Sequence, residues 1–228
     1  MRLTKSDIDE SIEGFLSLLK CSPRGAVFNP WWQVDGANDI GPVAPVIRRE
    51  QLQAYLSERI GKAQLALIGE ALGYQGGHFT GIAMTSERIL LTAKPGVERC
   101  DVFSEIKPRR TSNVEKAPRG FSEPTASIIW GTVLRLGVPG DQFVLWNVFP
   151  WHSFDSRVGM LSNRTPKSAE VAAGVPLLKV FLDLFASARV IAVGRVAASQ
   201  LPSAACVRHP KSGGSALFRR QIASLLLV

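Results

Sequence analysis

The sequence is poor in cysteine. Its 228 residues include three, Cys21, Cys100 and Cys206, and these are odd in number and widely spaced. Neither a disulfide framework nor a zinc-ligand pattern can be drawn from such a set. With 46% hydrophobic residues, a chain of this length buries a full core without cross-links or metals. We therefore expect a protein of a reducing, intracellular compartment.

The sequence also lacks long apolar runs and two common nucleotide-binding motifs. No run reaches the ~18 residues of a membrane span, and acidic residues interrupt the N-terminus, where a signal peptide has an apolar core. There is no internal repeat, no GxGxxG directly after a predicted strand and no GxxxxGK[ST]. We expect a soluble, cytoplasmic monomer that makes no contact with membranes.

Basic residues outnumber acidic ones. The chain has 27 Lys and Arg against 19 Asp and Glu, a formal net charge of +8 and a pI near 9.8. Such a positive field attracts polyanions, of which nucleic acid is the commonest. Because many basic proteins bind nothing specific, charge alone does not decide the partner.

Short apolar runs alternate with amphipathic segments along most of the chain. This alternation predicts a three-layer α/β/α sandwich around a central, mainly parallel four-stranded sheet, in one domain over 1–228. Residues 1–46 form an N-terminal extension, with a helix over 4–20 and a proline-rich irregular part that contains Trp31 and Trp32. The predicted strands are 65–68, 142–148, 190–193 and 205–208, and the helices after the extension are 48–60, 123–136, 168–186, 195–200 and one from residue 215.

Residues 86–121 differ in kind from the rest of the chain. They carry many Lys and Arg residues together with prolines, which predicts a short helix followed by a long, basic, mobile loop. Long loops in compact domains are functional or disordered, and a solvated charge run is the alternative interpretation.

Polar residues stand at three predicted strand ends. Glu70 follows the first strand, Asn147 lies near the end of the second, and His209 follows the last. The carboxyl ends of parallel strands meet at one edge of a sheet, so an acid, an amide and an imidazole converge there. Each residue alone also fits a structural role: a helix cap for Glu70, a loop partner for Asn147 and a turn before Pro210 for His209. Their matching positions favour a site.

Four motifs carry a family resemblance. GEALG at 69–73, followed by GGHFTG at 76–81, resembles the first motif of the uracil-DNA glycosylase superfamily, near GEAPG of family four and GGN-x-TG of family five. WNV at 146–148 resembles the motif TNV, NRTP at 163–166 resembles NR-x-P, and HP at 209–210 resembles the opening of HPS. The similarity covers about residues 62–228 in the right order. Leu72 and Lys211 depart from the family's Pro and Ser.

The resemblance implies that the protein removes uracil from DNA by hydrolysing the N-glycosidic bond. It implies that Glu70 orients the attacking water and that His209 stabilises the charge at uracil O2. Asn147 would read the base edge. It further implies a base pocket in which Phe79 stacks on the base and Met84 stands where family five has a phenylalanine. Glu87 stands at that family's aspartate and is the alternative carboxylate. The implied substrate-binding residues are Gly69, Ala71, Gln75, Phe79, Met84 and Asn147.

Two basic elements are expected to hold uracil-containing DNA beside this pocket. They are the loop at 107–119 and the segment at 211–220, in which Leu217 is a candidate wedge. Phosphate contacts by such elements position DNA without reading its sequence. The residues expected to bind DNA are Arg109, Arg110, Lys211, Ser212, Gly213 and Arg219.

Family four holds an iron-sulfur cluster through four cysteines, and two of their positions fall at Trp151 and Gly174 here. Cys21, the one early cysteine, has no second cysteine two or three residues away. Because a cluster needs thiolate ligands, we expect no cluster, no metal and no other cofactor. Apolar packing around Trp151 and Gly174 should fill the space.

The competing interpretation is a non-catalytic or small-molecule module that binds a nucleotide or a sugar phosphate in the glycine loop. A DNA-binding scaffold without catalysis is a third. Activity on uracil-containing DNA distinguishes the three.

Overall fold

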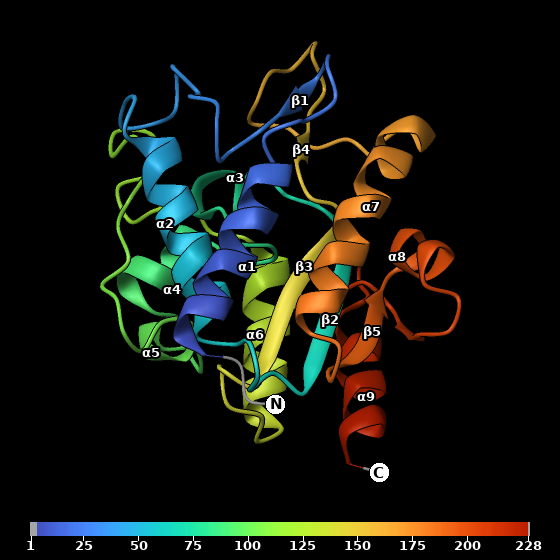
Figure 1. The fold of residues 1–228 in the computed structure, drawn as a ribbon. Helices are drawn as coiled ribbons and strands as arrows, with labels where there is room; N and C mark the ends of the chain where they lie inside the picture. Colours follow the sequence, from blue (N-terminus) through green and yellow to red (C-terminus); the bar gives the residue numbers. More distant parts are fainter. Residues whose placement is uncertain (1–3, 228) are drawn as a thin grey trace.

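Four parallel strands form the centre of the molecule. The computed structural model describes residues 4–227, and its main sheet contains β2 (Leu65–Ala71), β3 (Phe143–Phe149), β5 (Arg189–Val193) and β6 (Ala205–Val207). The strand order is β3-β2-β5-β6. Figure 1 shows β3, β2 and β5 side by side in this order. β2 and β3 are nearly continuous apolar runs, which is typical of strands covered on both faces. The predicted four-stranded parallel sheet is confirmed.

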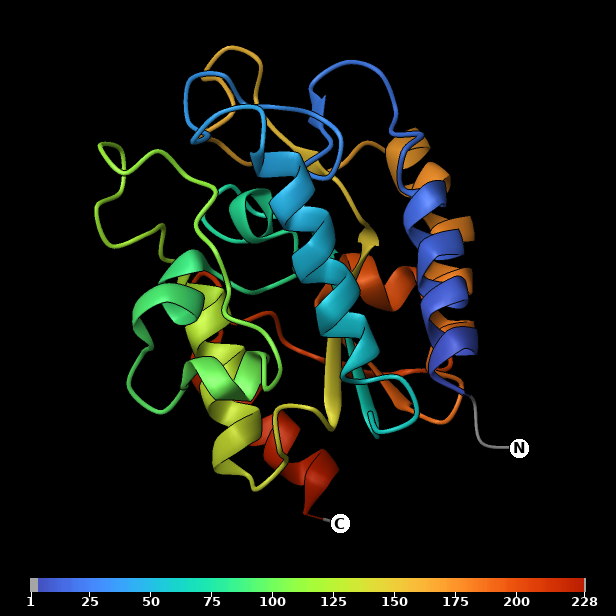
Figure 2. The same ribbon diagram turned by 60° about the vertical axis from the view of Figure 1, so that its left-hand side comes forward.

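Helices cover both faces of this sheet. α1 (Lys5–Leu18) and α7 (Ser168–Leu184) lie on one face, and α6 (Pro124–Arg135) and α9 (Ser215–Leu226) lie on the other (Figures 1 and 2). Trp146 of β3 stacks on Phe181 of α7 with ring centroids 4.9 Å apart, whereas Phe143 packs against Trp130 of α6 at 4.7 Å. The side chains of β3 therefore bind the two helical layers to the sheet.

The remaining elements are short or lie outside the main sheet. They are β1 (Val27–Phe28), α2 (Ala44–Ser57), α3 (Gly77–Thr80), α4 (Glu87–Thr92), α5 (Arg99–Val102), β4 (His152–Ser153) and α8 (Arg195–Gln200). Within residues 4–227, every helix falls short of the length and apolarity that a membrane crossing requires.

The N-terminal extension contains more regular structure than predicted. Thr4 caps α1 by accepting a hydrogen bond from the Asp7 N–H. β1 pairs antiparallel with β4. Strands of two residues are too short to give a recognisable sequence pattern. α2 begins at Ala44 rather than residue 48, because Pro45 lies in the first helical turn, where no backbone donor is needed.

The segment predicted as a mobile basic loop is anchored to the body of the protein. It contains α4 and α5, of which one helix was expected. The Glu87 carboxylate accepts hydrogen bonds from the Thr111 and Ser112 N–H groups at 2.8 and 3.0 Å. The Glu58 carboxylate accepts from the Ser104 N–H at 2.8 Å. Buried carboxylates thus hold the loop at two points.

The packing expected around Trp151 and Gly174 is confirmed. Trp151 is buried in the hydrophobic core, and its indole N–H donates to the Leu19 carbonyl at 2.9 Å. Gly174 brings α7 directly onto the end of β3, where any Cβ atom would clash with the Val148 carbonyl.

Candidate active site

A cavity of about 750 Å³ lies at the carboxyl edge of the sheet. Strand and helix ends supply its walls, which is where α/β proteins bind ligands. Six residues expected in the site line it: Glu70, Ala71, Gln75, His209, Lys211 and Ser212. The other lining residues with polar side chains are Tyr74, Glu123, Thr125, Asn163, Arg164 and Thr165.

Glu70 stands at the end of β2, with its side chain in the cavity. Burial raises the pKa of Glu70, while a hydrogen bond from Thr165 and the charge of Lys211 act in the opposite direction. A carboxylate that is partly desolvated and faces an open cavity has the properties of a general base. Its fixed position comes from the pairing of β2 with β3 and β5 on its two sides.

His209 follows β6 and faces the same cavity. Its Nδ1 accepts a hydrogen bond from the Lys211 N–H at 3.1 Å, so the neutral ring carries its proton on Nε2. Burial lowers the pKa of His209, and the charges of Lys211 and Arg208 lower it further. The imidazole is therefore a neutral donor at neutral pH.

The NRTP motif brings a loop to the cavity. The Asn163 side-chain oxygen accepts a hydrogen bond from the Tyr74 N–H at 3.0 Å, which joins this loop to the glycine loop. Arg164 pairs with Glu170 through two hydrogen bonds of 2.6 Å. Thr165 then lies beside Glu70. The sequence motif was recognised, but its residues were not assigned to the site.

Glu123 is a further cavity residue that the sequence does not reveal. It was expected only as the first residue of a helix, and it does directly precede α6. Its side chain makes no capping hydrogen bond and instead projects over Gly73 and Gly76 of the glycine loop. A glutamate followed by proline at a helix start resembles an ordinary N-cap, so no sequence signal separates the two roles.

Three residues expected to bind the base lie together next to the cavity rather than in its wall. A Cβ atom on Gly69 would stand 2.6 Å from Asn147 Oδ1 and 3.1 Å from Met84 Sδ. Gly69 and Asn147 are opposite each other in the β2–β3 register, one residue before Glu70. Both polar atoms of the Asn147 amide are buried and have no hydrogen-bond partner among residues 4–227. A buried amide of this kind calls for a functional explanation.

Phe79 is fully buried and is covered on one face by another aromatic ring. Phe121 lies parallel to it, with centroids 4.3 Å apart and planes 9° apart. The cavity walls formed by the described residues do not include Phe79. A base could stack on the face that Phe121 occupies only after Phe121 moves.

The alternative carboxylate, Glu87, does not share the site with Glu70. Glu87 is 1% exposed, and its two carboxylate oxygens accept hydrogen bonds from the backbone and the hydroxyl group of the anchored loop. Its place in α4 makes it a structural acceptor. Of these two carboxylates, Glu70 is the one that lines the cavity.

The residues expected to bind DNA fall into two groups. Lys211 and Ser212 line the cavity, while Gly213 and Arg219 continue from it along the exposed segment that starts α9. In the basic loop, Arg109 pairs with Glu50 on the surface. The Arg110 guanidinium is used within that loop, where it donates to the Ala117 and Pro118 carbonyls, both at 2.8 Å.

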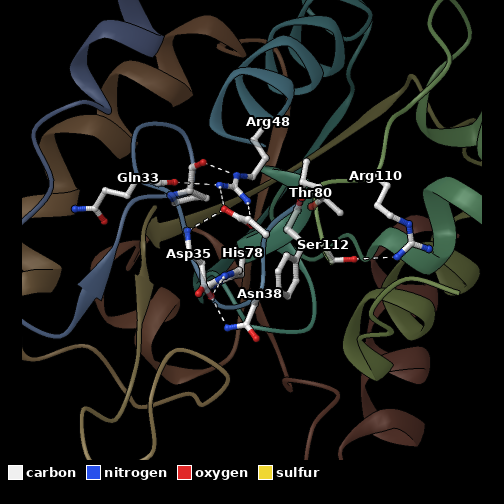
Figure 3. A network of polar contacts seen from close by, with 12 residues as sticks. Gln33, Asp35, Asn38, Arg48, His78, Thr80, Arg110 and Ser112 are labelled. Atoms are coloured by element: carbon white, nitrogen blue, oxygen red, sulfur yellow. Dashed lines mark hydrogen bonds and ion pairs between the residues drawn. The ribbon is translucent and has the colours of Figure 1, made fainter. Parts of the chain in front are cut away.

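A buried polar network joins the N-terminal extension to α3, which belongs to the glycine loop (Figure 3). Arg48 of α2 pairs with Asp39 at 2.7 Å, and Asp39 accepts the Asp35 N–H at 2.9 Å. The Asp35 carboxylate lies 3.1 Å from His78 Nε2 in α3, and His78 Nδ1 lies 2.9 Å from His152 Nδ1. The N-terminal extension is thereby joined to the loop that carries the site.

If each contact in this network is a hydrogen bond, one of the two groups in the His78–Asp35 contact must carry a proton. His152 Nε2 faces the Ser162 carbonyl at 2.8 Å and must donate to it. Burial lowers the pKa of His152 to about 3, so His152 is neutral and its Nδ1 accepts from His78. A hydrogen bond between His78 Nε2 and Asp35 then needs a second proton. Burial lowers the pKa of His78, whereas the hydrogen bond to Asp35 acts in the opposite direction.

The residues do not fit an iron-sulfur cluster. Cys21, Cys100 and Cys206 are all exposed free thiols, and a cluster of the expected kind takes four cysteine ligands. No group of three or more His, Cys, Asp or Glu within residues 4–227 is arranged to hold a metal ion.

Metal analysis of the purified protein tests this directly. We expect no stoichiometric iron and no charge-transfer absorption in the visible spectrum, because the chain has three cysteines and a cluster of this kind takes four. Iron at one cluster per chain would show that other residues supply the ligands.

A four-stranded parallel sheet between two helical layers, with a polar cavity at its carboxyl edge, places this chain among the α/β sandwich proteins whose site lies at the strand ends. No protein-family model and no curated protein matches the sequence. Among solved structures the fold is similar to that of wild-type SMUG2 from Pedobacter heparinus, with a TM-score of 0.61 and 14% sequence identity. The alignment covers 96% of this chain and 97% of that chain, so the two proteins share the fold over nearly their whole length.

Proposed function

We propose that this protein is a DNA glycosylase that removes uracil by hydrolysing the N-glycosidic bond and leaves an abasic site. The observation that carries the proposal is the meeting of Glu70 and His209, from the ends of β2 and β6, in one cavity of about 750 Å³. A flipped nucleotide needs a pocket of this kind. The fold shared with SMUG2, a uracil-DNA glycosylase, supports the same reaction class.

The two residues take complementary parts in the reaction. Glu70 orients the attacking water and stabilises the cationic sugar. His209 donates its Nε2 proton in a hydrogen bond to uracil O2, where negative charge develops as the base leaves. A neutral donor suits this part because its low pKa leaves the proton on the ring without an added charge.

We assign the selection of the base to Gly69, Met84 and Asn147, which lie together beside the cavity. The Asn147 amide can donate to uracil O4 and accept from N3–H, a pair that cytosine presents with opposite polarity. Its two unpartnered atoms are what a base edge would satisfy. Gly69 lies against this amide and against Met84, and Ala71 and Gln75 extend the surface into the cavity. Phe79 provides the stacking face once Phe121 has moved aside.

Charge in the cavity argues against a nucleotide or sugar-phosphate module. Glu70 and Glu123 both project into it, and Lys211 is the cation that acts on both. Two carboxyl groups beside a phosphate would repel it unless they were protonated. An uncharged base and its sugar fit the same walls without this penalty.

The test uses oligonucleotides with one uracil, single-stranded and double-stranded, followed by alkali to cleave at abasic sites. We expect cleavage at the uracil position and none in matched oligonucleotides that carry thymine or cytosine there. Binding without cleavage would indicate a scaffold that has lost catalysis. Neither binding nor cleavage would favour the small-molecule module.

We further propose that phosphates are held by the segment 211–220 and by Arg109 and Arg110, with Leu217 as the wedge that fills the gap left by the flipped base. Replacing Arg219 and Arg220 together by alanine should flatten the salt dependence of binding. Each lost phosphate contact lowers the log-log slope by about 0.9 on duplex DNA and ~0.7 on single strands. Base preference should not change, because phosphate contacts position the DNA and do not specify its sequence. Fluorescence anisotropy at several salt concentrations measures the slope.

Arg219 and Arg220 are exposed on α9, so their replacement leaves the core intact. The matched control replaces Lys62 and Arg135, which are also exposed but lie at the opposite end of the sheet and at the far end of α6. An equal effect of the two double variants would mean that the slope depends on net charge alone. The phosphate contacts would then be made by other residues. The Arg109 and Arg110 pair is the third variant of the series.

A further inference from the structure

The carboxyl group of Glu123 occupies the glycine loop. A Cβ atom on Gly73 would stand 3.1 Å from Glu123 Oε1, and a Cβ atom on Gly76 would clash with Oε2. The two glycines therefore leave room for this one side chain. The glycine loop, whose sequence resembles a substrate-binding motif, therefore also packs against a second carboxyl group, that of Glu123.

This acid has no internal partner. Glu123 Oε2 is buried and makes no hydrogen bond within the described chain. Although the residue directly precedes α6, its side chain does not cap the helix. A buried carboxyl oxygen without a donor is costly when charged and much less so when protonated. Its remaining open direction is the cavity, which Glu123 lines together with Glu70 and His209.

The surroundings favour the protonated form. Burial raises the pKa of Glu123 to about 7, and the nearby charge of Lys211 lowers it. The N-terminal end of α6 also favours the anion, because its partial positive charge stabilises carboxylates. Near neutral pH the group thus exists in both forms, which is the condition for an efficient proton donor.

We propose that Glu123 is the general acid of this site and protonates the departing base, while Glu70 takes a proton from the attacking water. This inference rests on the proposed glycosylase function. It assigns different chemistry to two carboxyl groups in one cavity, a division of labour set by their different surroundings.

The proton balance closes within the cavity. The bond between C1′ and the base nitrogen breaks, and its electron pair leaves with the base. The proton of Glu123 neutralises that base. Water forms the new bond to C1′ and releases a proton to Glu70. Glu123 has then lost one proton and Glu70 has gained one, and exchange with solvent restores both.

The experiment compares uracil and 5-fluorouracil in the same DNA. Fluorine withdraws electrons from the ring, so the departing fluorouracil is a more stable anion and needs protonation less. Glu123→Gln should lower single-turnover excision of uracil by about 10²-fold or more, and that of 5-fluorouracil by at least about tenfold less. The fall in the wild-type rate above pH 7, where Glu123 loses its proton, should be absent in this variant.

Two variants control for structure. Glu123→Asp keeps an acid and should retain part of the base-dependent difference and of the alkaline fall. Glu13→Gln removes an exposed carboxylate of α1, away from the cavity and the basic elements, and should change neither. Equal losses on both bases with an unchanged pH profile would make Glu123 a structural residue and overturn the inference. A wild-type protein that excises neither base would instead overturn the proposed function itself.

A second measurement does not depend on activity. Since the folded-state pKa of Glu123 lies above its ordinary value of 4.5, the wild type should lose stability relative to Glu123→Gln as pH rises from about 4.5 to about 7. Above that range the difference in melting temperature should stay constant. A difference that does not vary with pH would show that the pKa of Glu123 in the folded protein equals its ordinary value of 4.5, so that the group is ionised at neutral pH and cannot act as the acid.

Discussion

Replacing Glu70 by glutamine should lower the rate of uracil excision by a factor of about 10²–10⁴. Glutamine keeps the size of the side chain and can still hydrogen-bond to Thr165, so the cavity should keep its shape. What is lost is the capacity to accept a proton from water and to balance the positive charge on the sugar. Single-turnover cleavage at saturating enzyme measures the chemical step without the contribution of DNA binding.

The control for this prediction is Glu87→Gln. Glu87 is the more buried carboxylate, and its oxygens hold the Thr111 and Ser112 N–H groups of the anchored loop. Its replacement should lower the melting temperature but leave the rate of the folded protein within a few-fold of wild type. Loss of excision in Glu87→Gln, with normal excision in Glu70→Gln, would reverse the assignment of the two carboxylates.

The pH dependence gives the same prediction an independent check. A general base must be ionised, so the wild-type rate should fall as pH drops through the pKa of Glu70. Burial raises that pKa above its ordinary value of 4.5. The acid limb should therefore lie above 4.5 and should disappear in Glu70→Gln, while the alkaline limb assigned to Glu123 should remain.

The main sheet could be predicted because its strands are simple in physical terms. β2 and β3 are covered on both faces, so they are nearly continuous apolar runs. The same rule of parallel strands predicts that Glu70 and His209 lie at one edge of the sheet. The paired two-residue strands β1 and β4 could not be found, because their pairing depends on chain folding between residues more than a hundred positions apart.

The details of the site could not be predicted, because they depend on the directions in which individual side chains point. Glu123 looks like a helix cap, and only the packing against Gly73 and Gly76 shows that it turns into the cavity. Asn147 was placed correctly at a strand end, but strand position does not say how far the amide lies behind the cavity wall. Phe79 was expected to be a free stacking face, and its cover by Phe121 comes from a residue forty-two positions later.

Replacing Asn147 by leucine should stabilise the protein and abolish uracil excision. Both polar atoms of the amide are buried without partners in the described structure, and an unsatisfied buried group of this kind costs about 1–3 kcal/mol. Leucine has a similar shape and packs on Met84 and Gly69 without that cost. The free energy of unfolding should rise by roughly this amount, seen as a melting temperature several degrees higher.

Excision should fall in the same variant because no group remains to read uracil O4 and N3–H, and a site built for such contacts loses several kcal/mol when the match is spoiled. Asn147→Asp is the companion variant: its carboxylate cannot donate to O4 and places a buried charge beside Gly69, so both stability and excision should fall. Calorimetry and single-turnover cleavage on the same preparations separate the two effects. Normal excision by Asn147→Leu would remove this residue from the base pocket, whereas a lower stability of that variant would mean that the amide already has a partner. If Asn147→Leu gains stability and loses excision, the amide destabilises the folded protein and is needed for its contact with the base.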